Sequence, residues 1–218
     1  MSALFGQLIN LFAAVLLLLA FGMLSQRKIL SLIHLYTLQG LALVAATVVV
    51  AYATKQPHLY WSAGITLVLK VFLIPWLLHR VIDRLGVRWD IETLINIPTT
   101  MLIGVVLVIF AFNLAAPISA LSSTIARGTL GIALACVLLS FMMMITRSKA
   151  VPQVIGFLSM ENGLFFAAAA ATYGMPMVVE LGIALDVLVG ILILGVFLFH
   201  IREQFDSLDI RHLEKLKE

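Results

Sequence analysis

The sequence is poor in charged residues. Asp, Glu, Lys and Arg together make up 11% of the 218 residues, whereas 62% are hydrophobic and the mean hydropathy is +1.12. A soluble domain carries about a quarter charged residues, so this chain has too few to cover a single core with a water-facing surface. The composition instead predicts a bundle of membrane-spanning helices of about 20 residues each.

Cysteine is nearly absent as well. The one cysteine, Cys136, allows no intrachain disulfide and no Cys-x-x-Cys motif. An iron–sulfur cluster or a nickel site requires several thiolates. The histidines show no metal-binding spacing such as His-x-x-x-His; they are His34, His58, His79, His200 and His212. We therefore expect no cofactor in this chain and place any redox centre in partner subunits.

Long apolar runs predict an all-α, polytopic membrane bundle of about seven transmembrane helices. Each run is about 20 residues or longer, and the third is interrupted by Lys70 and Pro75. The predicted spans are Leu4–Leu24, Ile29–Ala53, Tyr60–Ile82, Leu94–Ala116, Thr124–Ile145, Val151–Thr172 and Met177–His200. The first has no basic segment before it and no small-residue cleavage site after it, so we interpret it as an uncleaved helix.

The distribution of basic residues predicts an orientation. Eleven lie at or after the ends of the first, third and fifth spans and at the C-terminus: Arg27, Lys28, Arg80, Arg84, Arg88, Arg147, Lys149, Arg202, Arg211, Lys215 and Lys217. The opposite side carries only Lys55 and Arg127. Because Lys and Arg accumulate on the cytoplasmic side, we expect the N-terminus outside and the C-terminus in the cytoplasm. Charges scattered over short loops do not indicate a nucleic-acid partner.

Two carboxylates interrupt the last two spans. Glu161 lies near the middle of one span and Asp186 near the middle of the next, and the short turn Tyr173–Pro176 between them predicts an antiparallel hairpin. The acids are nearly equidistant from that turn, so their depths should differ by only about 2 Å. A charge at such depth costs at least a few kcal/mol and usually marks an ion or proton path.

Polar and small residues accompany both acids. Ser159 and Asn162 flank Glu161 and can hydrogen-bond a partner beside it, while Gly182, Asp186 and Gly190 share one helix face that lets a neighbouring helix approach. Burial disfavours a carboxylate and a nearby cation favours it, so a carboxyl group between these effects can exchange protons near neutral pH. The alternative is that both acids are protonated, structural hydrogen-bond donors.

Lys70 is the third intramembrane charge. Pro75 follows it by five residues and should kink or open the helix one turn beyond the lysine. Beside an acid, Lys70 would form a buried pair whose charge state can be switched. Three roles remain open at this point: a proton relay, a group that only neutralises an acid, and a side chain that extends to the interface.

Four segments resemble component E of hydrogenase-4 and of formate-hydrogenlyase-type membrane [NiFe]-hydrogenases: Val154–Gly163, Val179–Asp186, Lys70–Pro75 and Ser207–Ile210. The last three spans are also similar to the K subunit of complex I and to the C subunit of Mrp antiporters. The K subunit carries an acid on each of its last two helices. Asp186 matches the second acid, whereas Glu161 lies one turn from the position of the first.

The resemblance implies a non-catalytic subunit of an ion-translocating hydrogenase complex in the cytoplasmic (inner) membrane, with Glu161, Asp186 and Lys70 in a proton path. It implies antiporter-like subunits, a complex I-like anchor subunit and a hydrogenase arm as partners. The alternatives are a scaffold that moves no ion, and a subunit of a cation/proton antiporter. The expected organisation is a five-helix bundle (residues 1–145), a K-subunit-like hairpin (146–202) and an amphipathic cytoplasmic tail (203–218).

Overall fold

The computed structural model describes residues 2–85, 93–121, 126–171, 182 and 184–193. Nearly all of this part is helical, and its one β-type contact is an isolated bridge between Thr93 and Arg147. The helices are α1 (Ser2–Ser25), α2 (Ile29–Thr54), α3 (His58–Thr66), the π-helix η1 (Leu67–Leu73), α4 (Ile74–Leu85), α5 (Ile97–Leu121), α6 (Ala126–Thr146) and α7 (Ala150–Ala171).

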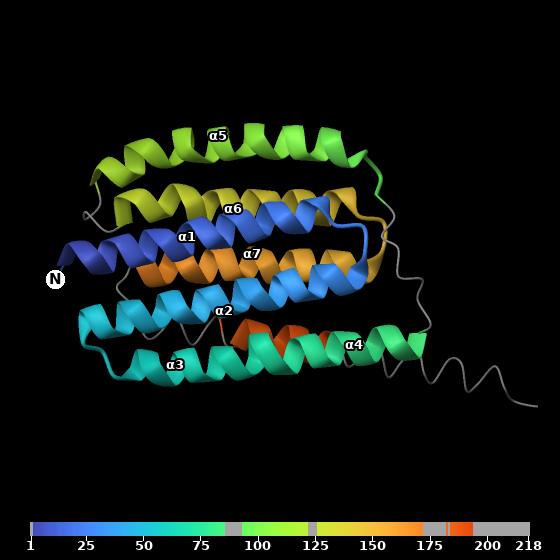
Figure 1. Ribbon diagram of the computed structural model, residues 1–218, viewed down its shortest axis with the longest axis horizontal. Coiled ribbons are helices and arrows are strands. Elements are labelled where there is room, and N and C mark those ends of the chain that lie inside the picture. Colours follow the sequence, from blue (N-terminus) through green and yellow to red (C-terminus); the bar gives the residue numbers. More distant parts are fainter. Residues whose placement is uncertain (1, 86–92, 122–125, 172–181, 183, 194–218) are drawn as a thin grey trace, which may run out of the picture.

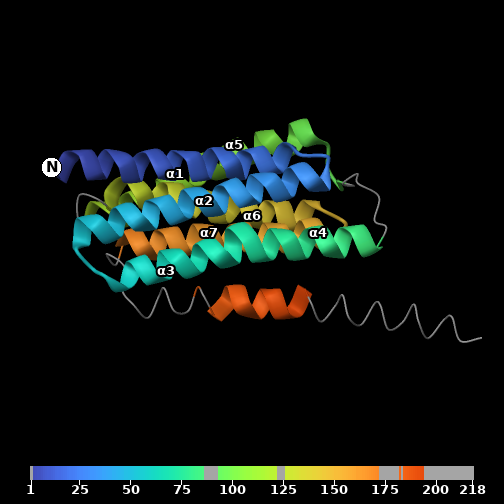
Figure 2. The same cartoon turned by 60° about the horizontal axis from the view of Figure 1, so that its bottom comes forward.

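The helices lie side by side along one direction and alternate in polarity (Figures 1 and 2). Five segments are long and apolar enough to cross a membrane: Leu4–Ser25, Ile29–Thr54, His58–Asp83, Ile97–Pro117 and Thr129–Thr146. They overlap the first five predicted spans, with ends that differ by up to five residues. The sixth predicted span is the 22-residue helix α7, and the described part of the seventh is the apolar helix Ala184–Ile193.

The all-α prediction is therefore confirmed for the described residues. The count of seven spans, the orientation and the division into domains remain predictions. The Tyr173–Pro176 turn and the tail 203–218 lie outside the described residues.

Close packing of α6 and α7 fixes the position of α7 in the bundle. A Cβ atom added at Gly163 would lie 3.1 Å from Cγ2 of Val137, and one added at Gly156 would lie 2.9 Å from Cγ of Met144. Small residues at such positions let two membrane helices approach closely. Because Gly156 and Gly163 of α7 face α6, the side chains of Glu161 and Asn162 lie on other faces of α7, toward α2 and η1.

The third predicted span is one continuous rod made of α3, η1 and α4 (Figure 1). Its π-helical turn surrounds Lys70, and the Ile74 N–H donates to the Leu69 carbonyl in the wider i→i−5 pattern. Pro75 has no N–H, and its ring clashes with the carbonyl four residues earlier, at Val71. The helix therefore opens on the N-terminal side of Pro75, around the lysine itself, and not one turn beyond it as the sequence suggested.

Candidate functional site

The three intramembrane charges meet at one point inside the bundle. Lys70 of η1 forms ion pairs with Glu161 of α7 and with Asp186 of the Ala184–Ile193 helix. Nζ of Lys70 donates a hydrogen bond to Oε2 of Glu161 and lies 3.1 Å from Oδ1 of Asp186. The whole residues are only 0%, 4% and 2% exposed, respectively. We refer to Lys70, Glu161 and Asp186 as the charge cluster.

Asn162 completes the surroundings of the lysine. Its Oδ1 accepts a hydrogen bond of 2.6 Å from Nζ of Lys70, and its Nδ2 donates one of 3.1 Å to Oε1 of Gln39 on α2. Because an ammonium has three protons to donate, the three oxygen neighbours from Glu161, Asn162 and Asp186 suit a charged lysine. The Asp186 contact is close enough for an ion pair, but it lacks the alignment of a hydrogen bond.

Local packing explains why Lys70 reaches the cluster. Thr66, Lys70 and Ile74 follow one another at intervals of four residues and are all at most 1% exposed, so they form one buried face of the rod. On α2, Gly40 faces this side: a Cβ atom added there would lie 3.2 Å from Cβ of Lys70. A larger residue at position 40 would push the π-helical turn away from α2.

The helix that carries Asp186 packs on α7 through Gly182. A Cβ atom at Gly182 would lie 2.5 Å from Cδ2 of Phe165 and 3.5 Å from Oε1 of Glu161. The same Phe165 ring lies 5.9 Å from Nζ of Lys70. A close approach is therefore present at Gly182, whereas no atom of the described residues outside its own helix lies within 4 Å of a Cβ atom added at Gly190.

The remaining predicted polar residue, Ser159, lies apart from the lysine. Its hydroxyl is 2.7 Å from that of Ser140 on α6, so it links α7 to α6. The structure thus brings together Lys70, Glu161, Asp186 and Asn162, while Ser159 braces the helix that carries two of them. The complete burial of Lys70 excludes an interfacial position for its side chain.

Two buried residues of α2 escaped the sequence analysis. Gln39 is 0% exposed and accepts the hydrogen bond from Asn162. Tyr36, one turn earlier, is also 0% exposed; its hydroxyl has no hydrogen-bond partner among the described residues and lies within electrostatic reach of both acids. An amide and a phenol inside an apolar run are the signals that could have indicated them.

Arg147 is a further buried cation, at one end of the bundle. Only 1% of it is exposed, and Nη2 donates to the carbonyls of Leu24 (2.7 Å) and Met23 (3.4 Å) at the end of α1. Burial lowers the pKa of this guanidinium below its usual value. The carbonyls at a helix C-terminus have no intrahelical partner, so Arg147 caps α1 and joins it to α6.

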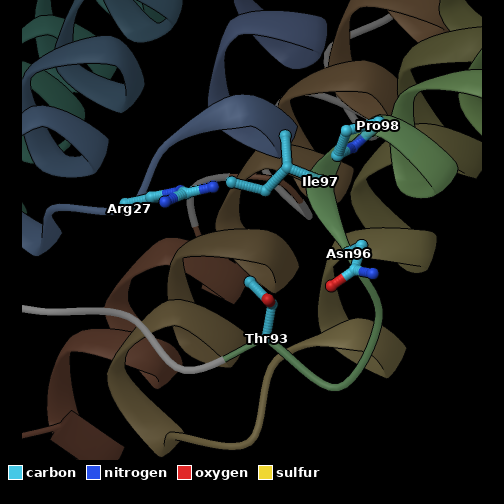
Figure 3. Close-up of a pocket in the computed structure, with 5 residues that line it drawn as sticks. All are labelled: Arg27, Thr93, Asn96, Ile97 and Pro98. Carbon is cyan, nitrogen blue, oxygen red and sulfur yellow. The ribbon is translucent and has the colours of Figure 1, made fainter.

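A surface pocket of about 340 Å³ lies at the bundle end where α1 and α2 connect (Figure 3). It is lined by Arg27, Thr93, Asn96, Ile97 and Pro98. These residues come from the α1–α2 connection and from the start of α5. The described residues that line it include no carboxylate, and Arg27 and Asn96 are exposed. It therefore lacks the buried, opposed charges that distinguish the cluster around Lys70.

Comparison with known proteins finds similarity along the whole chain. The chain is 29% identical over 218 residues to an uncharacterized protein, Rv0085, of Mycobacterium tuberculosis, covering 100% of this chain and 99% of that protein. It is 24% identical over 214 residues to hydrogenase-4 component E of Escherichia coli K12 and of Shigella flexneri, covering 97% of this chain and 98% of theirs. No protein-family model and no solved structure matches the chain.

Proposed function

We propose that the chain is a membrane-arm subunit of a [NiFe]-hydrogenase-type complex, and that Lys70, Glu161 and Asp186 relay protons within it. The distant similarity to hydrogenase-4 component E over nearly the full length supports the first part. A single observation carries the second: a lysine contacts two carboxylates, and all three residues are buried within apolar helices.

The charges of the cluster support proton exchange. One ammonium balances one carboxylate, so a second ionised acid would leave an uncompensated buried charge, which costs several kcal/mol. The neutral form of the cluster therefore holds one additional proton on Glu161 or Asp186. Oε1 of Glu161 and both carboxyl oxygens of Asp186 have no hydrogen-bond partner among the described residues, so either acid has an oxygen at which this proton can bind.

The π-helical turn supports the same role. Lys70 lies in the middle of η1, and π-helical turns within α-helices occur frequently at functional sites. A small change in the winding of this turn would move the ammonium between Glu161 and Asp186, and the proton would then settle on the acid that the lysine leaves. Asn162 stays bound to Lys70 and Gln39 and keeps the ammonium from leaving the cluster.

In this proposal, the partner subunits supply the metal centres and the electron transfer. No group of three or more potential metal ligands occurs in the described part of the chain, so nickel, iron and iron–sulfur centres belong to partner subunits in this proposal. The partners are antiporter-like membrane subunits, a complex I-like anchor subunit and a hydrogenase arm. Their electron transfer would drive the movement of charge through the membrane arm.

Isolation of the complex tests this assignment. We expect the chain, tagged at its N-terminus and extracted gently from its own membranes, to copurify with antiporter-like subunits and with a nickel-containing arm. Native mass spectrometry gives the composition, and elemental analysis gives the nickel content. A homo-oligomer without partners or nickel would contradict the hydrogenase assignment.

A further inference from the structure

A pair of histidines outside the charge cluster joins α2 to α4. The rings of His34 and His79 have centroids 6.0 Å apart and meet edge to face at 71°. Nδ1 of His79 lies 3.0 Å from the Pro75 carbonyl. A carbonyl oxygen only accepts hydrogen bonds, so Nδ1 of His79 carries a proton and Nε2 is the atom that can take up another. Imidazole is the side chain that exchanges protons most readily near neutral pH.

The histidine pair is accessible from the surface of the chain. His34 is exposed and His79 is half-buried. With Trp76, Arg80 and Asp83, His79 lines a surface hollow of about 370 Å³. The Arg80 guanidinium lies 5.2 Å from the centre of the Trp76 ring, so these two side chains form one surface group. Tryptophan beside charged residues is typical of the membrane–water interface, which places the pair at the edge of the membrane.

The pair and the charge cluster lie along one seam of the bundle. The α3–η1–α4 rod runs antiparallel to α2 (Figures 1 and 2), and the contact between Gly40 and Lys70 aligns the two. His34 precedes Gly40 by six residues and His79 follows Lys70 by nine. At 1.5 Å of rise per residue, the Cα atoms of His34 and His79 lie about 9 and 14 Å along the helix axes from the level of the Gly40–Lys70 contact, on the same side of it.

Along the axis of α2, Tyr36 lies at a level between His34 and Gly40, which contacts Lys70. It follows His34 by two residues on α2 and lies one turn before Gln39, which bonds to the Asn162 ligand of Lys70. Its buried hydroxyl has no hydrogen-bond partner in the described part of the chain and is within electrostatic reach of both acids. A buried hydroxyl without a partner destabilises the fold, so stability does not explain why Tyr36 stands at this position.

We propose that His34, His79 and Tyr36 form an entry branch through which protons reach the charge cluster from the bundle end where α2 begins. The branch rests on the function proposed above. Nε2 of His79 takes a proton from the surface. The Tyr36 oxygen accepts a proton as it releases the one it carries, and a carboxylate of Glu161 or Asp186 is the final acceptor. Each transfer conserves protons and requires no oxidant or reductant.

The test uses the assembled complex in membrane vesicles and three variants: Tyr36→Phe, His79→Gln and the double variant His34→Gln/His79→Gln. We expect proton translocation at least about tenfold slower in all three variants, since a positioned proton-transfer group typically contributes about 10²- to 10⁴-fold. Added imidazole should restore much of the rate in both histidine variants, but not in Tyr36→Phe. A group with only a structural role would show no such rescue.

Two substitutions serve as matched controls. Tyr52→Phe changes an exposed tyrosine on α2, the helix that also carries Tyr36; the ring of Tyr52 contacts Phe5. His58→Gln changes a histidine at the start of α3, at the end of the rod opposite to His79. Both should leave the translocation rate unchanged.

Normal rates in Tyr36→Phe and His79→Gln would overturn the branch, and so would slow rates without rescue in His79→Gln. Asp186→Asn separates the two proposals. If Asp186→Asn impairs translocation while the branch variants are normal, only the branch is wrong. If Asp186→Asn and Glu161→Gln are both normal as well, the proposed proton relay itself is wrong.

Discussion

Replacing Lys70 by methionine removes the one cation of the charge cluster and keeps a side chain of similar length. In the neutral cluster Lys70 balances one carboxylate, and the other acid carries a proton. Without the lysine, the remaining carboxylate must also take a proton. An ordinary carboxyl group has a pKa about 3 units below neutral, so this protonation costs about 4 kcal/mol at pH 7, which agrees with the 3–5 kcal/mol typical of broken buried ion pairs.

The loss of stability caused by Lys70→Met increases with pH. The folded Lys70→Met protein binds a proton that the unfolded chain does not bind at pH 7, so its stability falls as pH rises and recovers toward pH 5. We expect a lower melting temperature in detergent and less assembled complex at pH 7, and a smaller deficit at pH 5.5. Lys55→Met is the control, because Lys55 is exposed at the end of α2 and its loss should change stability by no more than about 0.5 kcal/mol.

A double variant makes the reasoning specific. In Lys70→Met/Asp186→Asn the only acid left in the cluster is Glu161, which carries one proton. The neutral wild-type cluster also carries one proton on its acids. The double variant should therefore regain most of the 4 kcal/mol, although it has lost two charged groups. If Lys70→Met is as stable as the wild type at pH 7, or if the double variant is less stable than the single one, the charge balance that we assign to the cluster is wrong.

Other parts of the structure give further expectations. Gly182→Ala should destabilise the packing of the last helix by about 1–3 kcal/mol, because its Cβ would lie 2.5 Å from Phe165, whereas Gly190→Ala should be neutral in the same thermal melts. Arg147→Met should lower stability by about 1–3 kcal/mol by leaving the carbonyls of Met23 and Leu24 without a donor, with Lys149→Met as the neighbouring comparison. Reporter fusions at the C-terminus and in the Tyr173–Pro176 turn should report opposite sides of the membrane; the same side for both would refute the hairpin.

Much of the fold could be predicted because long apolar runs leave the backbone few alternatives. Within lipid, backbone polar groups must bond internally, so each run becomes a helix. The predicted span Ile29–Ala53 differs from α2 by one residue at its end. The π-helical turn was anticipated only as a disturbance near Pro75. Its position depends on the clash with the carbonyl four residues before the proline, and this places the opening around Lys70.

The sequence singled out the three charged residues one by one but did not say which of them would contact one another. Composition alone shows that Glu161, Asp186 and Lys70 are expensive inside a membrane. Which acid Lys70 contacts depends on how η1, α7 and the Asp186 helix pack. In the structure Lys70 forms ion pairs with both Glu161 and Asp186. An amide inside an apolar run marks Gln39 as unusual, but its partner Asn162, like the contact of Arg147 with the end of α1, depends on packing between distant parts of the chain. Arg147 was counted as a loop cation, and it is instead the buried cap of α1.

Proton translocation per turnover, measured in vesicles that contain fully assembled complex, tests the central claim most directly. Asp186→Asn and Glu161→Gln keep the shape and hydrogen bonding of the side chains but remove the titratable groups. Each leaves Lys70 with one carboxylate, so the complex should assemble. We predict fewer protons translocated per turnover in both variants. A normal stoichiometry in both would contradict the relay and leave a scaffold that moves no protons.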